Sequence, residues 1–138
     1  MIVVDTNVLS EEMGATPDPT VHAWFVSQNP LDLYTSAATE AEIRFGLATM
    51  PDGRRKRELA AAASRVLSLF GDRILPFDSA AARDFAAIMA DRRRLGRPIQ
   101  IFDAQIAAIA RSRGMSVATR DVDDFADTGI TVIDPWSA

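Results

Sequence analysis

Cysteine is absent from this chain of 138 residues, and histidine occurs only once, at His22. The absence of cysteine excludes a disulfide scaffold, a thiolate zinc site and a cysteine nucleophile. A single histidine does not support a histidine-rich metal site or a histidine-based catalytic triad, so we expect a surface or capping role for His22. The sequence has neither the roughly 18 consecutive apolar residues of a membrane span nor the basic start and apolar core of a signal peptide. We therefore expect a soluble, cytoplasmic protein that does not associate with membranes.

The chain also has no excess of positive charge: its net charge is −4. This balance argues against a passive nucleic-acid coat, whose surface is usually broadly positive. The basic residues lie in clusters and are nearly all arginine, which suits bidentate contact with phosphate or carboxylate. Each cluster alone is more typical of a solvated helix face. The clusters comprise residues 54–57, residues 92–94 with Arg97, and Arg111 with Arg113.

The composition is that of one globular domain over residues 1–138, with 48% hydrophobic residues and ordinary numbers of glycine and proline. Short apolar runs alternate with helical patterns, without an internal repeat or a linker. This alternation is typical of a doubly wound α/β domain with a central, mostly parallel sheet of roughly four or five strands flanked by helices. Strands are expected near residues 2–4, 31–37, 73–77, 116–118 and 131–133, and helices beginning near residues 8, 19, 39, 54, 79 and 99.

The stretch from Ile2 to Asn7 organises the predicted sheet. Three apolar, mostly β-branched residues suit a central strand buried on both faces, and Asp5 follows them directly. In open α/β sheets, ligands bind beyond the carboxyl ends of the strands, so Asp5 is expected at the functional edge. Alternatively, residues 5–7 form a turn in which Asp5 or Asn7 caps the following short helix. This stretch alone supports both interpretations about equally.

Two further carboxylates lie near expected helix starts. Glu40 and Arg44 are spaced as a solvent-side pair, which places Glu42 about 200° away around the helix, facing the strand ends. A carboxylate that points inward is costly unless a positive group meets it. Glu42 also fits a capping box with Thr39, and Asp103 lies on the margin of its helix, where it fits an N-cap. Each of the two acids therefore has a structural interpretation as well.

Asp121 follows the strand expected at residues 116–118 and completes a set of acidic residues at one edge of the sheet. Mutual repulsion makes such a set unfavourable when it is empty, so a hard divalent cation is its natural occupant. Oxygen ligands alone favour Mg²⁺ or Mn²⁺ over zinc or copper. Such ions polarise a phosphoryl group and generate hydroxide from bound water, and a pair of them can clamp both the attacking and the leaving oxygens. Its members are Asp5, Glu42, Asp103 and Asp121.

Five stretches of the chain resemble, in order and at suitable spacing, the motifs of PIN-domain nucleases, and within that family those of the VapC-type toxins of bacterial toxin–antitoxin pairs. Each motif is weak alone, whereas the ordered set is specific and spans the chain from end to end. The stretches are DTNVLSE (5–11), SAATEAEIRFGL (36–47), FDAQIAAIA (102–110), VATRDVDDF (117–125) and TGITVIDPW (128–136).

The resemblance implies a metal-dependent endoribonuclease that uses Mg²⁺ or Mn²⁺ to hydrolyse RNA. It also implies a cognate antitoxin protein that occludes the site, and a homodimer. The acidic ligands of the family map onto Asp5, Glu42, Asp103 and Asp121. The chain departs from the family pattern at the last position, where relatives often carry Asn and supply the acid slightly later. Asp124 is therefore an alternative fourth ligand, and Asp123 is less suited.

Polar residues within the same motifs are expected to support the acidic ligands. The resemblance implies that they orient water or ligands from behind the metal site. Arg120, beside Asp121, is expected to hold the RNA strand. The supporting residues are Thr6, Asn7, Ser36 and Thr119.

Three alternative functions share some of these features. A phospho-acceptor receiver module also has an acidic pocket at the carboxyl edge of a parallel sheet, but it needs a lysine there, and the only lysine is Lys56 in an expected helical hairpin. A haloacid-dehalogenase-like phosphatase is disfavoured because Asn7 stands where its second aspartate belongs. A third alternative keeps the fold without catalysis, as a binding or regulatory subunit. The sequence specifies neither the RNA target, the number of ions, nor the antitoxin.

Overall fold

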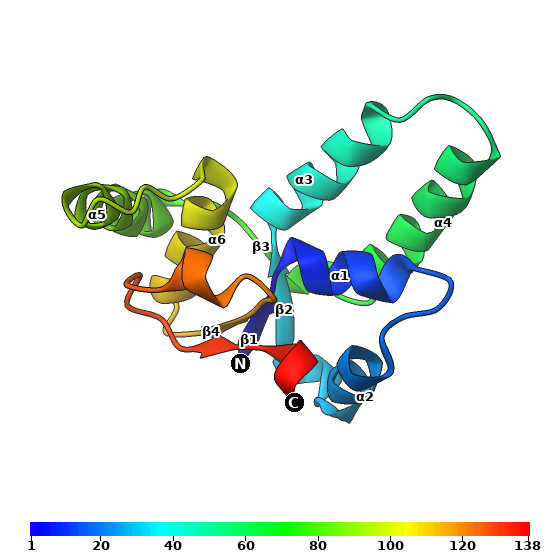
Figure 1. The fold of residues 1–138 in the computed structure, drawn as a ribbon, viewed down its shortest axis with the longest axis horizontal. Helices are drawn as coiled ribbons and strands as arrows, with labels where there is room; N and C mark the ends of the chain where they lie inside the picture. Colours follow the sequence, from blue (N-terminus) through cyan, green and yellow to red (C-terminus); the bar gives the residue numbers. More distant parts are fainter.

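A computed structural model describes all residues from Met1 to Ala138 and contains one sheet of five parallel strands. The strand order is β3-β2-β1-β4-β5, so the first strand of the chain is the central one (Figure 1). The expected α/β architecture is confirmed, with parallel pairing throughout. The strands are Ile2–Val4 (β1), Leu33–Ser36 (β2), Ile74–Leu75 (β3), Ser116–Ala118 (β4) and Val132–Ile133 (β5).

The register of β1 determines which residues leave the sheet together. Val4 is aligned with Ala118 of β4, so Asp5 and Thr119 emerge side by side at the carboxyl edge. The Asp5 N–H donates to the Ala118 carbonyl at 2.9 Å, which extends the pairing one residue beyond β1. The chain passes from β1 to β2 on one side, and β4 lies on the other side. Such a switch point is where open α/β sheets bind ligands.

Six α-helices and several short 3₁₀ turns surround the sheet (Figure 1). None of the helices combines the length and the apolar character that crossing a bilayer requires. The helices are Thr6–Met13 (α1), Pro19–Ser27 (α2), Ala37–Ala48 (α3), Arg54–Ser68 (α4), Ser79–Arg94 (α5) and Ile101–Arg111 (α6), and two of the 3₁₀ turns are Val122–Phe125 (η3) and Pro135–Ser137 (η4).

The core has two halves, one on each face of the sheet. Val4 packs in a cluster with buried residues of α1, α2, α3 and α4. Val3 and Val117 pack in the other cluster, mainly with α5 and α6. Successive side chains of a strand point to opposite faces, which is why neighbouring residues of β1 serve different clusters. The apolar run at the start of the chain is therefore buried on both faces, as expected.

Capping side chains set the helix starts. Asp18 and Asp78 accept hydrogen bonds from the first turns of α2 and α5. The Ser36 hydroxyl accepts from the Thr39 N–H at 3.0 Å, so α3 begins at residue 37, earlier than expected. The capping box assigned to Thr39 and Glu42 is therefore wrong, because Ser36 already caps the helix.

Two other expectations are wrong in detail. The strand expected over residues 31–37 is shorter, because Pro30–Asp32 form a 3₁₀ turn before β2. Phe102, although apolar, is 38% exposed. Its helix begins at Ile101 instead of Ile99, and the first turn lies beside a cleft, beyond the packed core.

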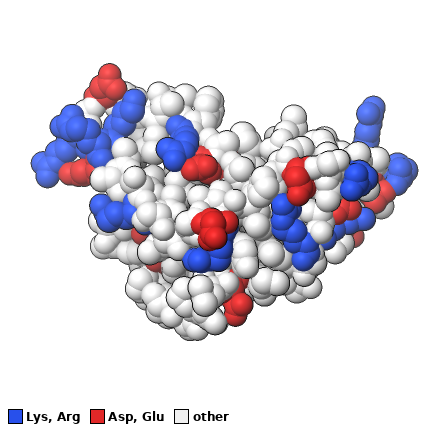
Figure 2. All heavy atoms as spheres, turned by 180° about the vertical axis from the view of Figure 1, so that it is seen from behind, with Lys and Arg blue, Asp and Glu red and all other residues white.

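The basic clusters occupy different environments. Arg54 pairs with Glu58 and Lys56 with Asp52 on the surface of α4, as expected for a solvated helix face. Seen from behind, the basic side chains gather toward the two ends of the molecule (Figure 2). Arg92 is the exception, because its side chain is buried.

Arg92 ties the C-terminal end of α5 to the segment that follows β4. Its Nε donates to the Arg97 carbonyl at 2.6 Å, and its Nη1 donates to the carbonyls of Asp124 and Ala126 at 2.7 and 2.9 Å. No carboxylate pairs with this buried charge, so the carbonyl dipoles replace its lost hydration. These contacts hold η3 in place, directly after Asp121.

We expect Arg92→Ala to lower the free energy of unfolding by about 3 kcal/mol, because it removes three hydrogen bonds to backbone carbonyls and leaves a cavity where the buried side chain was. Urea denaturation measures this difference. Arg93→Ala is the matched control, since Arg93 is an exposed neighbour on the same helix. This substitution should change the free energy of unfolding by less than about 0.5 kcal/mol. Equal stability of the two variants would show that the buried contacts are not structural.

Candidate functional site

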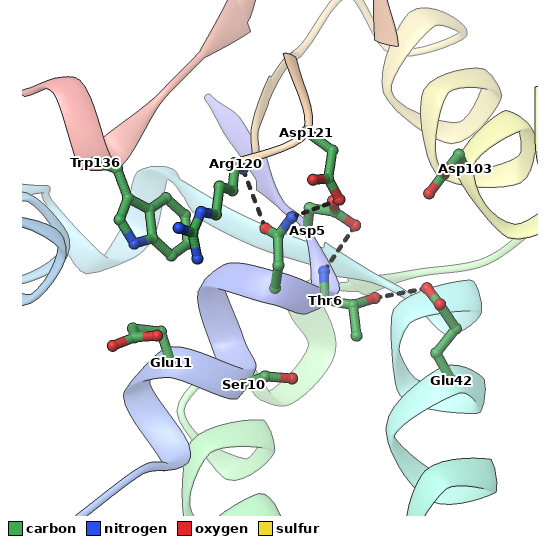
Figure 3. Close-up of a pocket in the computed structure, with 10 residues that line it drawn as sticks. Asp5, Thr6, Ser10, Glu11, Glu42, Asp103, Arg120, Asp121 and Trp136 are labelled. Carbon is green, nitrogen blue, oxygen red and sulfur yellow. Dashed lines mark hydrogen bonds between the residues drawn. The ribbon is translucent and has the colours of Figure 1, made fainter. Parts of the chain in front are cut away.

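The carboxyl edge of the sheet opens into an acidic cleft of about 460 Å³ (Figure 3). Half of its ten lining residues are acidic, and only one is hydrophobic. All four carboxylates that the sequence placed in one set line this cleft. The lining residues are Asp5, Thr6, Asn7, Ser10, Glu11, Glu42, Asp103, Arg120, Asp121 and Trp136.

Asp5 is almost completely buried, with 3% of its surface exposed. Its Oδ1 accepts from the Thr6 N–H at 2.7 Å, which makes it the N-cap of α1. Its Oδ2 accepts from the Thr119 hydroxyl at 2.7 Å. The capping interpretation is confirmed, and the same carboxylate also lines the cleft, as its place at the strand end predicted.

Burial raises the pKa of Asp5 from its ordinary value of 3.8 to about 6. Loss of hydration is the largest cause, and the negative charges of Glu42 and Asp121 act in the same direction. The hydrogen bonds from Thr119 and Thr6 favour the anion but do not offset its burial. At neutral pH the chain therefore holds an anion that it stabilises poorly by itself.

A hydrogen-bond network joins α1 to the segment after β4. The Asn7 side-chain amide donates to the Thr119 hydroxyl and to Asp121 Oδ2, both at 3.1 Å. The Asn7 side-chain oxygen, Oδ1, accepts from the backbone N–H of Arg120 at 3.3 Å. The Asp121 N–H donates in turn to the Thr119 hydroxyl at 3.0 Å. Asn7 and Thr119 thus fix Asp121 at the cleft, close to Asp5.

Glu42 reaches the cleft from α3. Its Oε1 accepts a hydrogen bond from the Thr6 hydroxyl at 2.7 Å. The expected solvent-side pair of Glu40 and Arg44 forms at 2.9 Å, so Glu42 faces inward as the helical spacing predicted. No cation pairs with Glu42, and a neutral hydroxyl is its hydrogen-bond partner.

Ser36 lies behind this contact and does not line the cleft. Its hydroxyl is 3.2 Å from the Thr39 hydroxyl, and both residues are fully buried. The Thr39 hydroxyl lies 3.4 Å from that of Thr6, which donates to Glu42. Ser36 is therefore two contacts away from the carboxylate.

Asp103 points into the cleft from the first turn of α6 (Figure 3). Gln100 occupies the N-cap position, so the N-cap interpretation of Asp103 is wrong. The pKa of Asp103 is raised from 3.8 to about 7, first by loss of hydration and then by the charges of Asp5 and other nearby acids. No basic group compensates its charge.

The structure places the two candidates for the fourth acid differently. Both residues are exposed, but Asp121 lines the cleft, whereas Asp124 in η3 lies outside the lining. The charge of Asp124 nevertheless contributes to the raised pKa of Asp103. Asp121 is therefore the acid that shares the cleft with Asp5.

Arg120 is the only cation on the cleft wall. Its Cζ lies 5.3 Å from the centroid of the Trp136 ring, and Figure 3 shows the guanidinium beside the indole. Trp136 comes from η4 at the C-terminal end of the chain. Arg120 and Trp136, the only cationic and the only hydrophobic residue of the lining, thus form a cation–π pair.

Sequence reasoning left three lining residues unassigned. Ser10 and Glu11 lie one helical turn after Thr6 and Asn7, so i, i+4 spacing along α1 was a usable signal. No periodicity points to Trp136, because only the tertiary fold returns the C-terminal end to the cleft.

The donor set of the cleft suits a hard divalent cation. Its four expected carboxylates form no ion pair with Lys, Arg or His, so their charge is uncompensated within the chain. No three acidic side chains come close enough together to enclose an ion by themselves. Mg²⁺ in proteins commonly uses one or two carboxylates and several waters, so an ion that keeps part of its hydration shell does not need three of them in contact.

Comparisons with known proteins agree with this geometry. The PIN domain family matches residues 2–130. The chain is similar to a VapC ribonuclease of Sinorhizobium fredii, with 45% identity over 137 residues that cover 99% of this chain and 98% of the relative.

Solved structures extend the similarity to three dimensions. The crystal structure of FitAcB from Neisseria gonorrhoeae matches with a TM-score of 0.91 and 39% identity over 100% of both chains. The structure of DNA-bound VapBC from Salmonella typhimurium matches with a TM-score of 0.81 and 27% identity over 97% of each chain. Because the family match spans most of the chain and these similarities span nearly all of it, the protein belongs to the PIN-domain family, in the group that includes the VapC ribonucleases.

Proposed function

We propose that this protein is a metal-dependent endoribonuclease, the toxin of a bacterial type II toxin–antitoxin pair, which hydrolyses RNA phosphodiester bonds. One observation carries the proposal: four carboxylates from four separate segments of the chain line one cleft without a neutralising cation. The ribonuclease name of the Sinorhizobium fredii relative supports RNA as the substrate class.

In this proposal the four carboxylates hold Mg²⁺ or Mn²⁺. Asp5 and Asp103 are the principal ligands in this proposal, because both line the cleft, lose hydration there and have no cationic partner in the chain. Glu42 from α3 and Asp121 from the segment after β4 complete the set. A divalent cation in the cleft supplies Lewis-acid polarisation of the phosphodiester and activation of a water.

Neutral polar residues keep these carboxylates in place. Thr119 donates to Asp5, Thr6 donates to Glu42, and Asn7 donates to Asp121. Such hydrogen bonds from neighbouring polar groups orient the carboxylates of metal centres, and Asp5 accepts a second one from the Thr6 N–H. Ser36 supports Glu42 indirectly: its hydroxyl contacts Thr39, and Thr39 contacts Thr6, which donates to Glu42.

A cognate antitoxin and a second copy of the chain are included as partners. The similar solved structures contain FitAB and VapBC complexes, which supports an antitoxin partner for this chain. The homodimer is proposed from the family resemblance alone. A receiver-like function has no such support, because Lys56 pairs with Asp52 on α4 and does not line the cleft.

We expect Asp5→Asn to reduce metal-dependent RNA cleavage by about 100-fold or more, because asparagine can still cap α1 but lacks the negative charge. The assay is cleavage of a cellular RNA pool by the purified protein with Mg²⁺ or Mn²⁺, beside a chelator control. Asp123→Asn is the matched variant, since Asp123 is exposed and lies outside the cleft, and it should cleave like the wild type. Full cleavage by Asp5→Asn would contradict the proposal, and no cleavage by any form would favour a non-catalytic subunit.

Asp121→Asn should lower both the cleavage rate and the apparent Mn²⁺ affinity by about 10- to 100-fold. Asp124→Asn should change each by less than about threefold, because its side chain lies outside the cleft lining. Cleavage rates measured against Mn²⁺ concentration separate the two variants. The opposite order of effects would make Asp124 the fourth ligand.

The raised pKa values of Asp5 and Asp103, about 6 and about 7, make the stability of the metal-free protein depend on pH. Between about pH 4 and about pH 7 the folded chain retains protons that the unfolded chain has released. The free energy of unfolding therefore falls as the pH rises through this range. The buried Asp5 alone contributes about 3 kcal/mol to the fall, at about 1.4 kcal/mol for each pKa unit.

Urea denaturation with chelator present, across the same pH range, tests this dependence. Asp103→Asn should gain stability relative to the wild type as the pH rises, because it removes one of the groups whose pKa is raised. Asp123→Asn should follow the wild-type curve. A constant difference between Asp103→Asn and the wild type at every pH would refute the assigned shift.

A further inference from the structure

Arg120 is the one positive side chain among the five acidic residues that line the cleft. An arginine so placed ordinarily pairs with a carboxylate, because its planar fork of donors matches the two oxygens. Its side chain instead lies over the Trp136 ring, and no ion pair or hydrogen bond joins the guanidinium to another protein group. Its N–H donors are therefore available to a ligand.

The Trp136 ring is held in place from two directions. The backbone N–H of Trp136 donates to Asp134 Oδ1 at 2.9 Å, which fixes the main chain under the ring, and Pro135 before it is buried. The side chain packs against the apolar cluster that includes Val8 and Val21 of α1 and α2, and Figure 1 shows η4 beside α2. The indole is therefore a fixed wall of the cleft.

The backbone of Arg120 is equally fixed. Its N–H donates to Asn7, and the residues on either side of it contact the hydrogen-bond network of Asp5. Only the side chain of Arg120 can therefore adopt different contacts. Glu11 and Asp121 line the same cleft, and neither forms an ion pair with the Arg120 guanidinium (Figure 3).

We propose that Trp136 is a positioning residue, which keeps the Arg120 guanidinium off the carboxylates and directs it to an RNA phosphate next to the one that is cleaved. The indole holds the guanidinium from one side, and no protein group engages its N–H donors, so they remain free for the phosphate oxygens. This inference rests on the proposed ribonuclease function and names the part of the site that recognises the strand.

The test measures binding of a short, fluorescent, single-stranded RNA of mixed sequence by anisotropy, with chelator present so that the RNA is not cut. Arg120→Ala should weaken binding about tenfold. It should also reduce the slope of log affinity against log salt concentration by about 0.7, the loss expected for one phosphate contact on a single strand. Arg65→Ala is the matched control, because Arg65 is exposed on α4 outside the cleft, and it should leave the slope unchanged.

Variants of Trp136 separate positioning from other roles. Trp136→Leu should reproduce most of the losses in affinity and in salt slope, and Trp136→Phe should retain more of both because it keeps an aromatic face. In the Arg120→Ala background, Trp136→Leu should cause no further loss, because the ring acts through the arginine. A further loss in that background, with an unchanged salt slope, would mean that the ring stacks on a base and would overturn the proposal.

Binding and cleavage are measured separately, so the inference and the proposed function can fail independently. Metal-dependent cleavage by the wild type, combined with unchanged RNA binding by Arg120→Ala, would overturn only the strand contact. Absence of cleavage, combined with the expected binding losses, would overturn the ribonuclease function and support the contact. Arg120→Ala removes an exposed side chain, so the test does not depend on whether Trp136→Leu folds.

Discussion

Uncompensated negative charge at the carboxyl edge of a parallel sheet is the constraint on which this structure depends. Asp5 cannot leave this edge, because its N–H continues the pairing of β1 with β4 and its side chain caps α1. Burial then makes its anion unfavourable, and the charges of Glu42 and Asp121 add to the effect. The neighbouring groups that could relieve this charge are neutral hydroxyls and amides, and the single cation, Arg120, lies over an indole. The cleft thus keeps its charge for a ligand that the chain does not supply.

The placement of several acids was predictable because it follows from local rules. An apolar run followed at once by Asp5 marks the end of a buried strand, and parallel strands end at one edge of their sheet. The same rule places Asp121 there, after β4. The spacing of Glu40 and Arg44 orients Glu42 inward, since one helix face cannot serve both solvent and cleft. Each of these deductions needs only the sequence pattern of a single strand or helix.

Other features escaped prediction because they depend on contacts between distant segments. Arg92 stands in a run of three arginines, and only the carbonyls of the segment after β4 distinguish it from its exposed neighbours. Phe102 fits an apolar stripe by its spacing, yet the first turn of its helix extends past the core. The Ser36 cap was hidden because Thr39 and Glu42 have the spacing of a capping box. Trp136 reaches the cleft only because η4 packs on α2.

The central claim is that the cleft holds a divalent cation, and calorimetric titration of metal-stripped protein with Mn²⁺ tests it most directly. We expect saturable binding by the wild type, its loss in Asp5→Asn, and its retention in the exposed control Asp123→Asn. The reason is that the cleft carboxylates, with water, are the only proposed ligands. Absence of saturable binding by the wild type, or equal binding by Asp5→Asn, would contradict the claim.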